Sequence, residues 1–148
     1  MKFKKKMKLL EFTINIKAKP EKVWNILFTM DSEGKWAGAM DEGSYFEGTW
    51  EKGSIIKFID PQNNGMYNLV QENIPCKEVR MKHLGWILQG ELSPQPWEDS
   101  TITYLLESRN KGTVLTAKVN SMDEFVDFFN SNYPKNFEKI KKFAEDDL

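Results

Sequence analysis

A chain of 148 residues with 40% hydrophobic content has the length and composition of one globular domain with a sizeable core. Its 21 basic and 22 acidic residues give a formal net charge of −1, so no global field points to nucleic acid or acidic lipid. The lone cysteine, Cys76, excludes an internal disulfide and a cysteine-based metal site, and it favours a reducing cytoplasm. We therefore expect a single cytoplasmic domain over residues 1–148 that binds no nucleic acid.

The N-terminal stretch predicts a strand. It does not have the pattern of a signal peptide, because Leu9 and Leu10 are followed at once by Glu11. No apolar run in the chain approaches the roughly 18 residues of a membrane span, so we expect none. Residues 8–17 instead alternate between apolar and polar side chains, which is the period of a half-buried strand. Its apolar face would carry Leu10, Phe12, Ile14 and Ile16.

A helix is expected after this strand. Pro20 suits the first turn of a helix because it has no amide hydrogen to leave unpaired. The apolar residues that follow fall at helical spacing: Val23, Trp24, Leu27 and Phe28. Asp31 or Ser32 would cap a further short turn that reaches Trp36. The glycines beyond it mark the segment up to Ser44 as rich in loops.

The middle of the chain contains short strand-like runs separated by turn signals. They cover residues 45–50, 54–59, 66–74, 79–88, 101–108 and 113–120. The pair Asn64-Gly65, which tolerates positive φ, marks a hairpin loop after the second run. Residues 91–99, which contain Pro94 and Pro96, are expected to form a loop. Consecutive strands at this spacing predict an antiparallel meander with one apolar face.

Strand parity indicates which side chains share a face of this sheet. In the run 79–88, His83 shares its face with Val79, Met81, Gly85 and Ile87, and the other face carries Arg80, Lys82, Leu84, Trp86 and Leu88. Because a sheet with one solvated face must cover the other, the only long element left, the C-terminal segment, is expected to pack on it.

The C-terminal segment, residues 121–148, predicts an amphipathic helix. Ser121 and Glu124 have the spacing of a capping box, in which each side chain bonds the other residue's amide. The apolar residues then recur in steps of three and four, which makes one wide stripe. The stripe consists of Met122, Phe125, Val126, Phe129, Tyr133, Phe137, Ile140 and either Phe143 or Ala144.

Pro134 interrupts this helical pattern. Inside a helix a proline costs roughly 3 kcal/mol, because a hydrogen bond is lost and the ring clashes with the preceding turn. We therefore expect a break near Asn132, with a short helix before it and a second helix or a kinked continuation from Pro134. The first part, with Phe125 and Phe129, would bound a cavity. The second part would hold the helix on the sheet through Phe137, Ile140 and Phe143.

The order strand, helix pair, six-stranded meander and long C-terminal helix resembles the helix-grip fold of the START and pollen-allergen superfamily, also called SRPBCC. Several local motifs are similar to its branch related to the activator of the heat-shock-protein-90 ATPase. They are KPEKVW at 19–24, FEGTW at 46–50, NIPCKEV at 73–79 and TVLT at 113–116. The fold class that this resemblance implies is α+β: a curved antiparallel sheet of six to seven strands wrapped around the C-terminal helix.

The resemblance also implies a cavity between the sheet and the C-terminal helix, which holds a small apolar or amphipathic molecule. It carries over no active site, because catalytic residues differ between members and no motif in this chain matches one. The branch relationship suggests a chaperone as an alternative partner, bound through the outer surface.

Candidate cavity residues are the lone histidine and aromatic side chains, several of which carry a polar atom that can orient an amphipathic ligand. His83 could contact a ligand or act as a general base near neutral pH, although a lone histidine is more often structural. The aromatic residues could equally fill the core. The expected ligand-binding set is Trp36, Trp50, Tyr67, His83, Tyr104, Phe125, Phe129 and Tyr133.

The sequence contains no catalytic or metal-binding motif, so we expect no catalytic residue, metal or cofactor. Cys76 reads as an incidental thiol. The carboxylates Asp41, Glu42, Glu47 and Glu51 cluster in sequence, but strand alternation is expected to scatter them over a solvated surface. These observations favour a binding protein. The alternatives are a chaperone regulator and a cofactor-free cyclase or hydrolase that uses His83 with a tyrosine.

Overall fold

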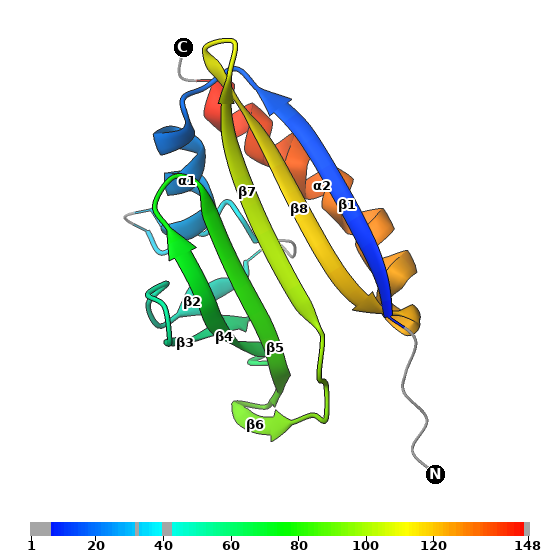
Figure 1. The fold of residues 1–148 in the computed structure, drawn as a ribbon. Coiled ribbons are helices and arrows are strands. Elements are labelled where there is room, and N and C mark those ends of the chain that lie inside the picture. The colour runs from blue at the N-terminus through cyan, green and yellow to red at the C-terminus, as the bar shows by residue number, and fades with distance from the viewer. Residues whose placement is uncertain (1–6, 32, 40–42, 147–148) are drawn as a thin grey trace.

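Figure 1 shows the fold in a computed structural model, which describes residues 7–31, 33–39 and 43–146. A long helix packs on one face of an eight-stranded sheet. This arrangement confirms the predicted α+β class and the helix-grip architecture. The elements are β1 (Met7–Ile16), α1 (Pro20–Phe28), β2 (Tyr45–Glu47), β3 (Ile55–Ile59), β4 (Gly65–Ile74), β5 (Glu78–Leu88), β6 (Glu91–Pro94), β7 (Thr101–Arg109), β8 (Gly112–Met122), η1 (Asp123–Phe125) and α2 (Val126–Glu145).

The strands lie in the order β1-β8-β7-β5-β4-β3-β2, with β6 paired to β5, and every pair is antiparallel. The first strand pairs with the last one over its whole length, so β1 forms one edge of the sheet with β8 beside it. β6 lies in a segment that the sequence predicts as a loop. It pairs with Gly85–Leu88, the part of β5 that lies beyond the residues paired with β7. Its proline, Pro94, is tolerated because β6 is an edge strand.

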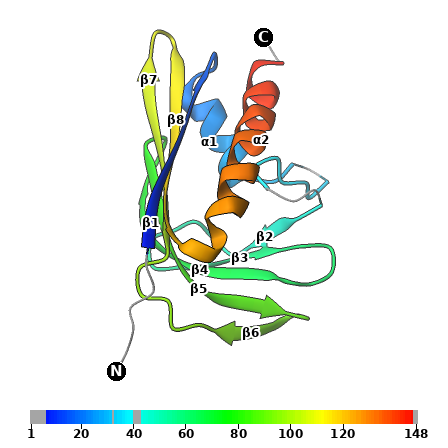
Figure 2. The same cartoon turned by 90° about the vertical axis from the view of Figure 1, so that its right-hand side faces the viewer.

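A β-bulge bends the pair of β4 and β5. The extra residue is Leu84, which lies between the pair of His83 with Asn68 and the pair of Gly85 with Tyr67. A bulge reverses the alternation of side chains beyond it and increases the local twist. The predicted sharing of one face by His83 and the residues from Gly85 onward is therefore wrong. The sheet curves, and β2, β3 and β4 run beneath α2 in Figure 2.

α2 is one helix from Val126 to Glu145 with Pro134 inside it, so the predicted break near Asn132 is wrong. Pro134 itself lies on the exposed face of the helix. Tyr133 and Phe137 are 0% and 2% exposed. Burying two aromatic side chains contributes about 2–3 kcal/mol each, which together exceeds the roughly 3 kcal/mol that the proline costs.

Both ends of α2 differ from the expected pattern. Ser121 still belongs to β8, and its Oγ donates to the carbonyl oxygen of Met122 at 2.8 Å. The helix is entered through the 3-10 turn η1, which has no side-chain cap, so the predicted capping box is wrong. At the C-terminal end, Ala144 is fully buried and Phe143 is 54% exposed. Ala144 therefore completes the apolar stripe, and the packing role expected of Phe143 is wrong.

α1 begins at Pro20, as predicted, and buries its apolar face. The second helix of the expected pair is absent from the described part of the following segment, residues 29–31, 33–39 and 43–44. The expected short turn is present and Asp31 caps it, because its Oδ1 accepts hydrogen bonds from two backbone amides at 2.8 and 2.9 Å. The alternative cap, Ser32, lies outside the described residues. Four described residues of this segment line the cavity described below: Trp36, Gly38, Ala39 and Ser44.

Candidate ligand cavity

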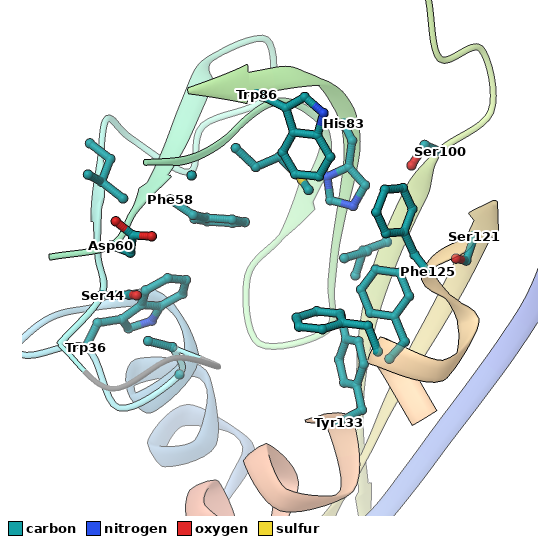
Figure 3. Close-up of a pocket in the computed structure, with 18 of the residues that line it drawn as sticks. Trp36, Ser44, Phe58, Asp60, His83, Trp86, Ser100, Ser121, Phe125 and Tyr133 are labelled. Carbon is teal, nitrogen blue, oxygen red and sulfur yellow. The ribbon is translucent and has the colours of Figure 1, made fainter. Parts of the chain in front are cut away.

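A cavity of about 350 Å³ lies between the curved sheet, the start of α2 and the segment that follows α1. Ligand sites in proteins commonly enclose about 300–1,000 Å³ and are lined by apolar and aromatic side chains with a few polar groups. This lining is of that kind. Figure 3 shows the space with Trp36, Ser44, Phe58 and Asp60 on one side, and with His83, Ser100, Ser121 and Phe125 on the other.

One wall is a cluster of aromatic rings. The ring centroids of Trp36 and Phe58 are 5.1 Å apart, and Trp50 lies 6.3 Å from Trp36 and 5.9 Å from Phe58. Trp36 is fixed further by a 2.8 Å hydrogen bond from its Nε1 to the carbonyl oxygen of Leu27. The loop that carries it is held by Asn136 of α2, whose Nδ2 donates to two carbonyl oxygens of that loop at 3.3 and 3.0 Å. This wall is therefore preformed.

The opposite wall contains Trp86, which packs edge-on against Trp97 at 5.1 Å and against Phe125 at 5.8 Å between centroids. Strand parity without a bulge places Trp86 on the other face from His83. The bulge at Leu84 brings both onto the cavity face. The only sequence signal for it is Gly85, since an isolated glycine inside a strand pattern suggests a bulge.

His83 is 3% exposed and lies on the cavity lining. Its Nδ1 is hydrogen-bonded to Oδ1 of Asn68, the residue that faces it on β4. The orientation of Asn68 is set in turn by its Nδ2, which donates to the carbonyl oxygen of Ile56 at 3.2 Å. The other ring nitrogen, His83 Nε2, is buried and has no hydrogen-bond partner among the described residues. Sequence reasoning selected His83 but missed Asn68.

The electrostatics of the site keep His83 uncharged. Burial disfavours the charged imidazolium, so it lowers the pKa of His83 from 6.5 to about 4. The ring is therefore neutral at physiological pH, with one nitrogen protonated and the other carrying a lone pair.

Two tyrosines meet across the sheet and α2 at the inner end of the cavity. The hydroxyl oxygens of Tyr104, from β7, and Tyr133, from α2, are 3.2 Å apart and share a hydrogen bond. Burial raises the pKa of both phenols, and the neighbouring Tyr104 raises that of Tyr133 further. Tyr133 is also stacked on Phe12 at 4.8 Å between centroids. The pair thus fixes the helix to the sheet and stays protonated.

Most of the expected ligand-binding residues line this cavity: Trp36, Trp50, His83, Tyr104, Phe125, Phe129 and Tyr133. Their role in binding remains a prediction. Tyr67 does not line the cavity. It alternates with Met66 and Asn68 along β4, and it packs with Ile59 and Ile87 in a second, smaller cluster. Its ring covers Gly85, where an added Cβ would lie 3.0 Å from it.

The described part of the chain has further features that bear on function: its potential metal ligands, its carboxylates, its cysteine and the apolar character of its helices. There, no group of three or more His, Cys, Asp or Glu side chains could hold a metal ion. Glu47 and Glu51 are exposed, and Asp41 and Glu42 lie outside the described residues. Cys76 is a free, half-buried thiol in a turn. No helix within the described ranges is long and apolar enough to cross a membrane.

An antiparallel sheet curved around a C-terminal helix, with an apolar cavity between them, is the helix-grip architecture of SRPBCC proteins. The chain is similar to the solution structure of the Aha1 dimer from Colwellia psychrerythraea, with 26% identity, a TM-score of 0.72 and coverage of 94% of this chain and 97% of that one. This match confirms the resemblance to the Aha1-like branch.

Two further structures share the fold at lower identity. Protein CV1439 from Chromobacterium violaceum is 14% identical with a TM-score of 0.67, over 93% of this chain and 96% of that one. CalU16 from Micromonospora echinospora is 12% identical with a TM-score of 0.69, over 96% of this chain and 77% of that one. No protein-family model matches the chain, and no curated protein matches it by sequence.

Proposed function

We propose that this protein binds a small apolar or amphipathic molecule in the cavity between the sheet and α2, in the cytoplasm. The observation that carries the proposal is the preformed aromatic cavity of about 350 Å³, which contains a buried polar atom, His83 Nε2, without a partner among the described residues. Filling such a space with an apolar molecule removes the cost of leaving aromatic surface unpacked, about 25 cal/mol per Å² of apolar area.

The protonation states in the cavity favour binding over acid–base catalysis. A general base works best when its pKa lies near the working pH, whereas burial lowers the pKa of His83 to about 4. A general acid needs a proton that it gives up readily, whereas burial raises the pKa of Tyr104 and Tyr133. These groups are poor proton carriers at neutral pH. They remain good neutral hydrogen-bonding groups.

The proposal is tested first by native mass spectrometry of protein purified from cells, and by the fluorescence of the neutral probe N-phenyl-1-naphthylamine. We expect a co-purifying small molecule or a saturable rise in probe fluorescence. Met66→Trp replaces a side chain of the lining with a larger one that fills the cavity, and it should abolish the rise in fluorescence. The control Leu92→Trp, at a position that is 49% exposed and outside the lining, should leave the rise unchanged. If no molecule co-purifies and the wild-type protein does not bind the probe, the proposal fails.

A second candidate function is regulation of a chaperone through the outer surface. It is favoured by the match to the Aha1 structure, which covers almost the whole of both chains. The two functions are separated by one measurement: the ATPase rate of heat-shock protein 90 with and without this protein. Stimulation that persists in Met66→Trp would assign the activity to the surface. No stimulation and no co-purified chaperone would remove this candidate.

A further inference from the structure

The cavity contains one buried acceptor that the protein does not satisfy. His83 is 3% exposed, its ring points into the pocket in Figure 3, and its Nε2 has no partner among the described residues. A buried polar atom left unpaired loses its hydrogen bond to water without replacement, so such an atom requires an explanation. Trp50 of the lining also has a buried nitrogen, Nε1, without a partner among the described residues, but an indole N–H is a donor and not an acceptor. Bonds within the protein engage Asp60, Asn64, Ser121, Tyr104 and Tyr133.

The protein also fixes which hydrogen-bonding role this nitrogen plays. Asn68 is 0% exposed and uses its Nδ2 to donate to the carbonyl oxygen of Ile56, an oxygen that can only accept. Its Oδ1 must then face His83 Nδ1. Because that oxygen is also an acceptor, the proton of the neutral ring resides on Nδ1. Nε2 therefore presents a lone pair, and only a donor can satisfy it.

We infer that the molecule held in this cavity is neutral and carries a hydroxyl or N–H group that donates a hydrogen bond to His83 Nε2. The inference rests on the proposed function and specifies the class of ligand. His83 is the binding contact, and Asn68 is a positioning residue that holds the tautomer through Ile56.

Three related classes of molecule are disfavoured by the same geometry. A hydrocarbon fills the space but leaves Nε2 unpaired, or removes a water from it without replacing its bond. An ether offers only acceptor oxygens and has the same defect. A carboxylate opposes one acceptor with another and must also lose the hydration of its charge in an aromatic pocket. Apolar alcohols, phenols and aromatic amines avoid all three costs.

The tautomer can be measured directly because the chain contains one histidine. In protein labelled with ¹⁵N-histidine, a two-bond ¹H–¹⁵N spectrum at pH 7 gives a single set of imidazole signals. We expect the pattern of a neutral ring with the proton on Nδ1, and Asn68→Leu should shift the ring toward a mixture of tautomers. A ring protonated on Nε2, or on both nitrogens, would overturn the inference.

The donor requirement is tested with a matched ligand series: 2-naphthol, 2-methoxynaphthalene and 2-naphthoate, measured by displacement of N-phenyl-1-naphthylamine. We expect 2-naphthol to bind about 10- to 100-fold more tightly than the ether, from one buried hydrogen bond, and the carboxylate to bind no better than the ether. Only 2-naphthol should move the Nε2 resonance. His83→Phe should abolish the difference between alcohol and ether, and Leu92→Ala, outside the lining, should leave it unchanged.

Two outcomes count against the inference and they are distinguishable. Equal binding of 2-naphthol and 2-methoxynaphthalene to the wild-type protein overturns the donor requirement but leaves the proposed function intact. Failure of all of these compounds and of the probe removes the proposed function, and the inference with it. Both results come from the wild-type protein, so they hold even where His83→Phe does not fold.

Discussion

Lowering the pH should destabilise this protein well before its carboxylates titrate, because of one side chain. His83 has a pKa of about 4 in the folded protein, where burial opposes its charge, and its ordinary pKa of 6.5 in the unfolded chain. Between these pH values the unfolded chain binds a proton that the folded protein does not. The free energy of unfolding therefore falls as the pH drops from about 6.5 to 4, and this contribution is constant above and below that window.

The size of the effect follows from the two pKa values. Their difference corresponds to about 3 kcal/mol over the whole window, at about 1.4 kcal/mol per pKa unit. Between pH 7 and pH 5 the expected loss is about 2 kcal/mol. Within the described ranges, Glu145 is the other group whose pKa shift bears on acid stability, and a lowered carboxyl pKa removes stability only as the pH falls below its ordinary value of 4.5. The interval from pH 7 to pH 5 thus isolates His83.

The assay is urea unfolding followed by tryptophan fluorescence at pH 7, 6 and 5, in wild-type protein and in His83→Gln. The wild-type free energy should fall by about 2 kcal/mol across the series, and that of the variant should change far less. A ¹⁵N titration of the lone histidine supplies an independent value for the folded pKa. A folded pKa near 6.5, or an equal pH slope in both proteins, would refute the reasoning.

Three further predictions concern α2 and are read from the same unfolding curves. Phe137→Ala should destabilise the protein by about 3–5 kcal/mol, because its ring is 2% exposed, whereas the same change at the 54% exposed Phe143 should cost less than about 1 kcal/mol. Pro134→Ala should stabilise the protein by about 1–3 kcal/mol, since it restores an amide inside a helix. Tyr133→Phe should cost about 1 kcal/mol, because Tyr104 loses the partner of its hydroxyl.

Each of these predictions has a result that contradicts it. Equal losses at the two phenylalanines would mean that the exposed one is covered in solution. A destabilising change at the proline would mean that the ring makes a contact worth more than the missing hydrogen bond. No effect of removing the Tyr133 hydroxyl would mean that water replaces it, and a water-filled inner cavity would follow.

The fold could be predicted from sequence because its signals are periodic and repeated. The alternation of Leu10 and Ile16 on β1, Pro20 at the start of α1 and the stripe through Phe137 on α2 each have a local cause, and tertiary packing agrees with them. Pro134 is the exception. The free-energy cost of a proline inside a helix depends only on the local backbone, whereas the burial of Tyr133 and Phe137 beside it depends on the rest of the molecule. Helix propensity alone therefore predicted a break that the structure does not have.

The site was harder to predict because its key features are not periodic. One extra residue, Leu84, decides that Trp86 faces the cavity, and a single inserted residue leaves no mark on a strand pattern except the glycine beside it. Asn68 is 15 residues away from His83 in sequence, and only strand register brings the two together. Seven of the eight residues expected from their type line the cavity, although they are only part of its lining. The eighth, Tyr67, points to the other face of the sheet.

The pairing of β1 with β8 has a consequence for the order of folding. Met7 faces Met122 across this ladder, so the first strand has no partner until most of the chain has been made. The helix that covers the inner face comes later still. During synthesis the meander therefore emerges with its apolar face uncovered, and contacts this distant in sequence form slowly. The cavity is the last part of the molecule to be enclosed, which makes the nascent chain vulnerable to aggregation at the surface that later lines the cavity.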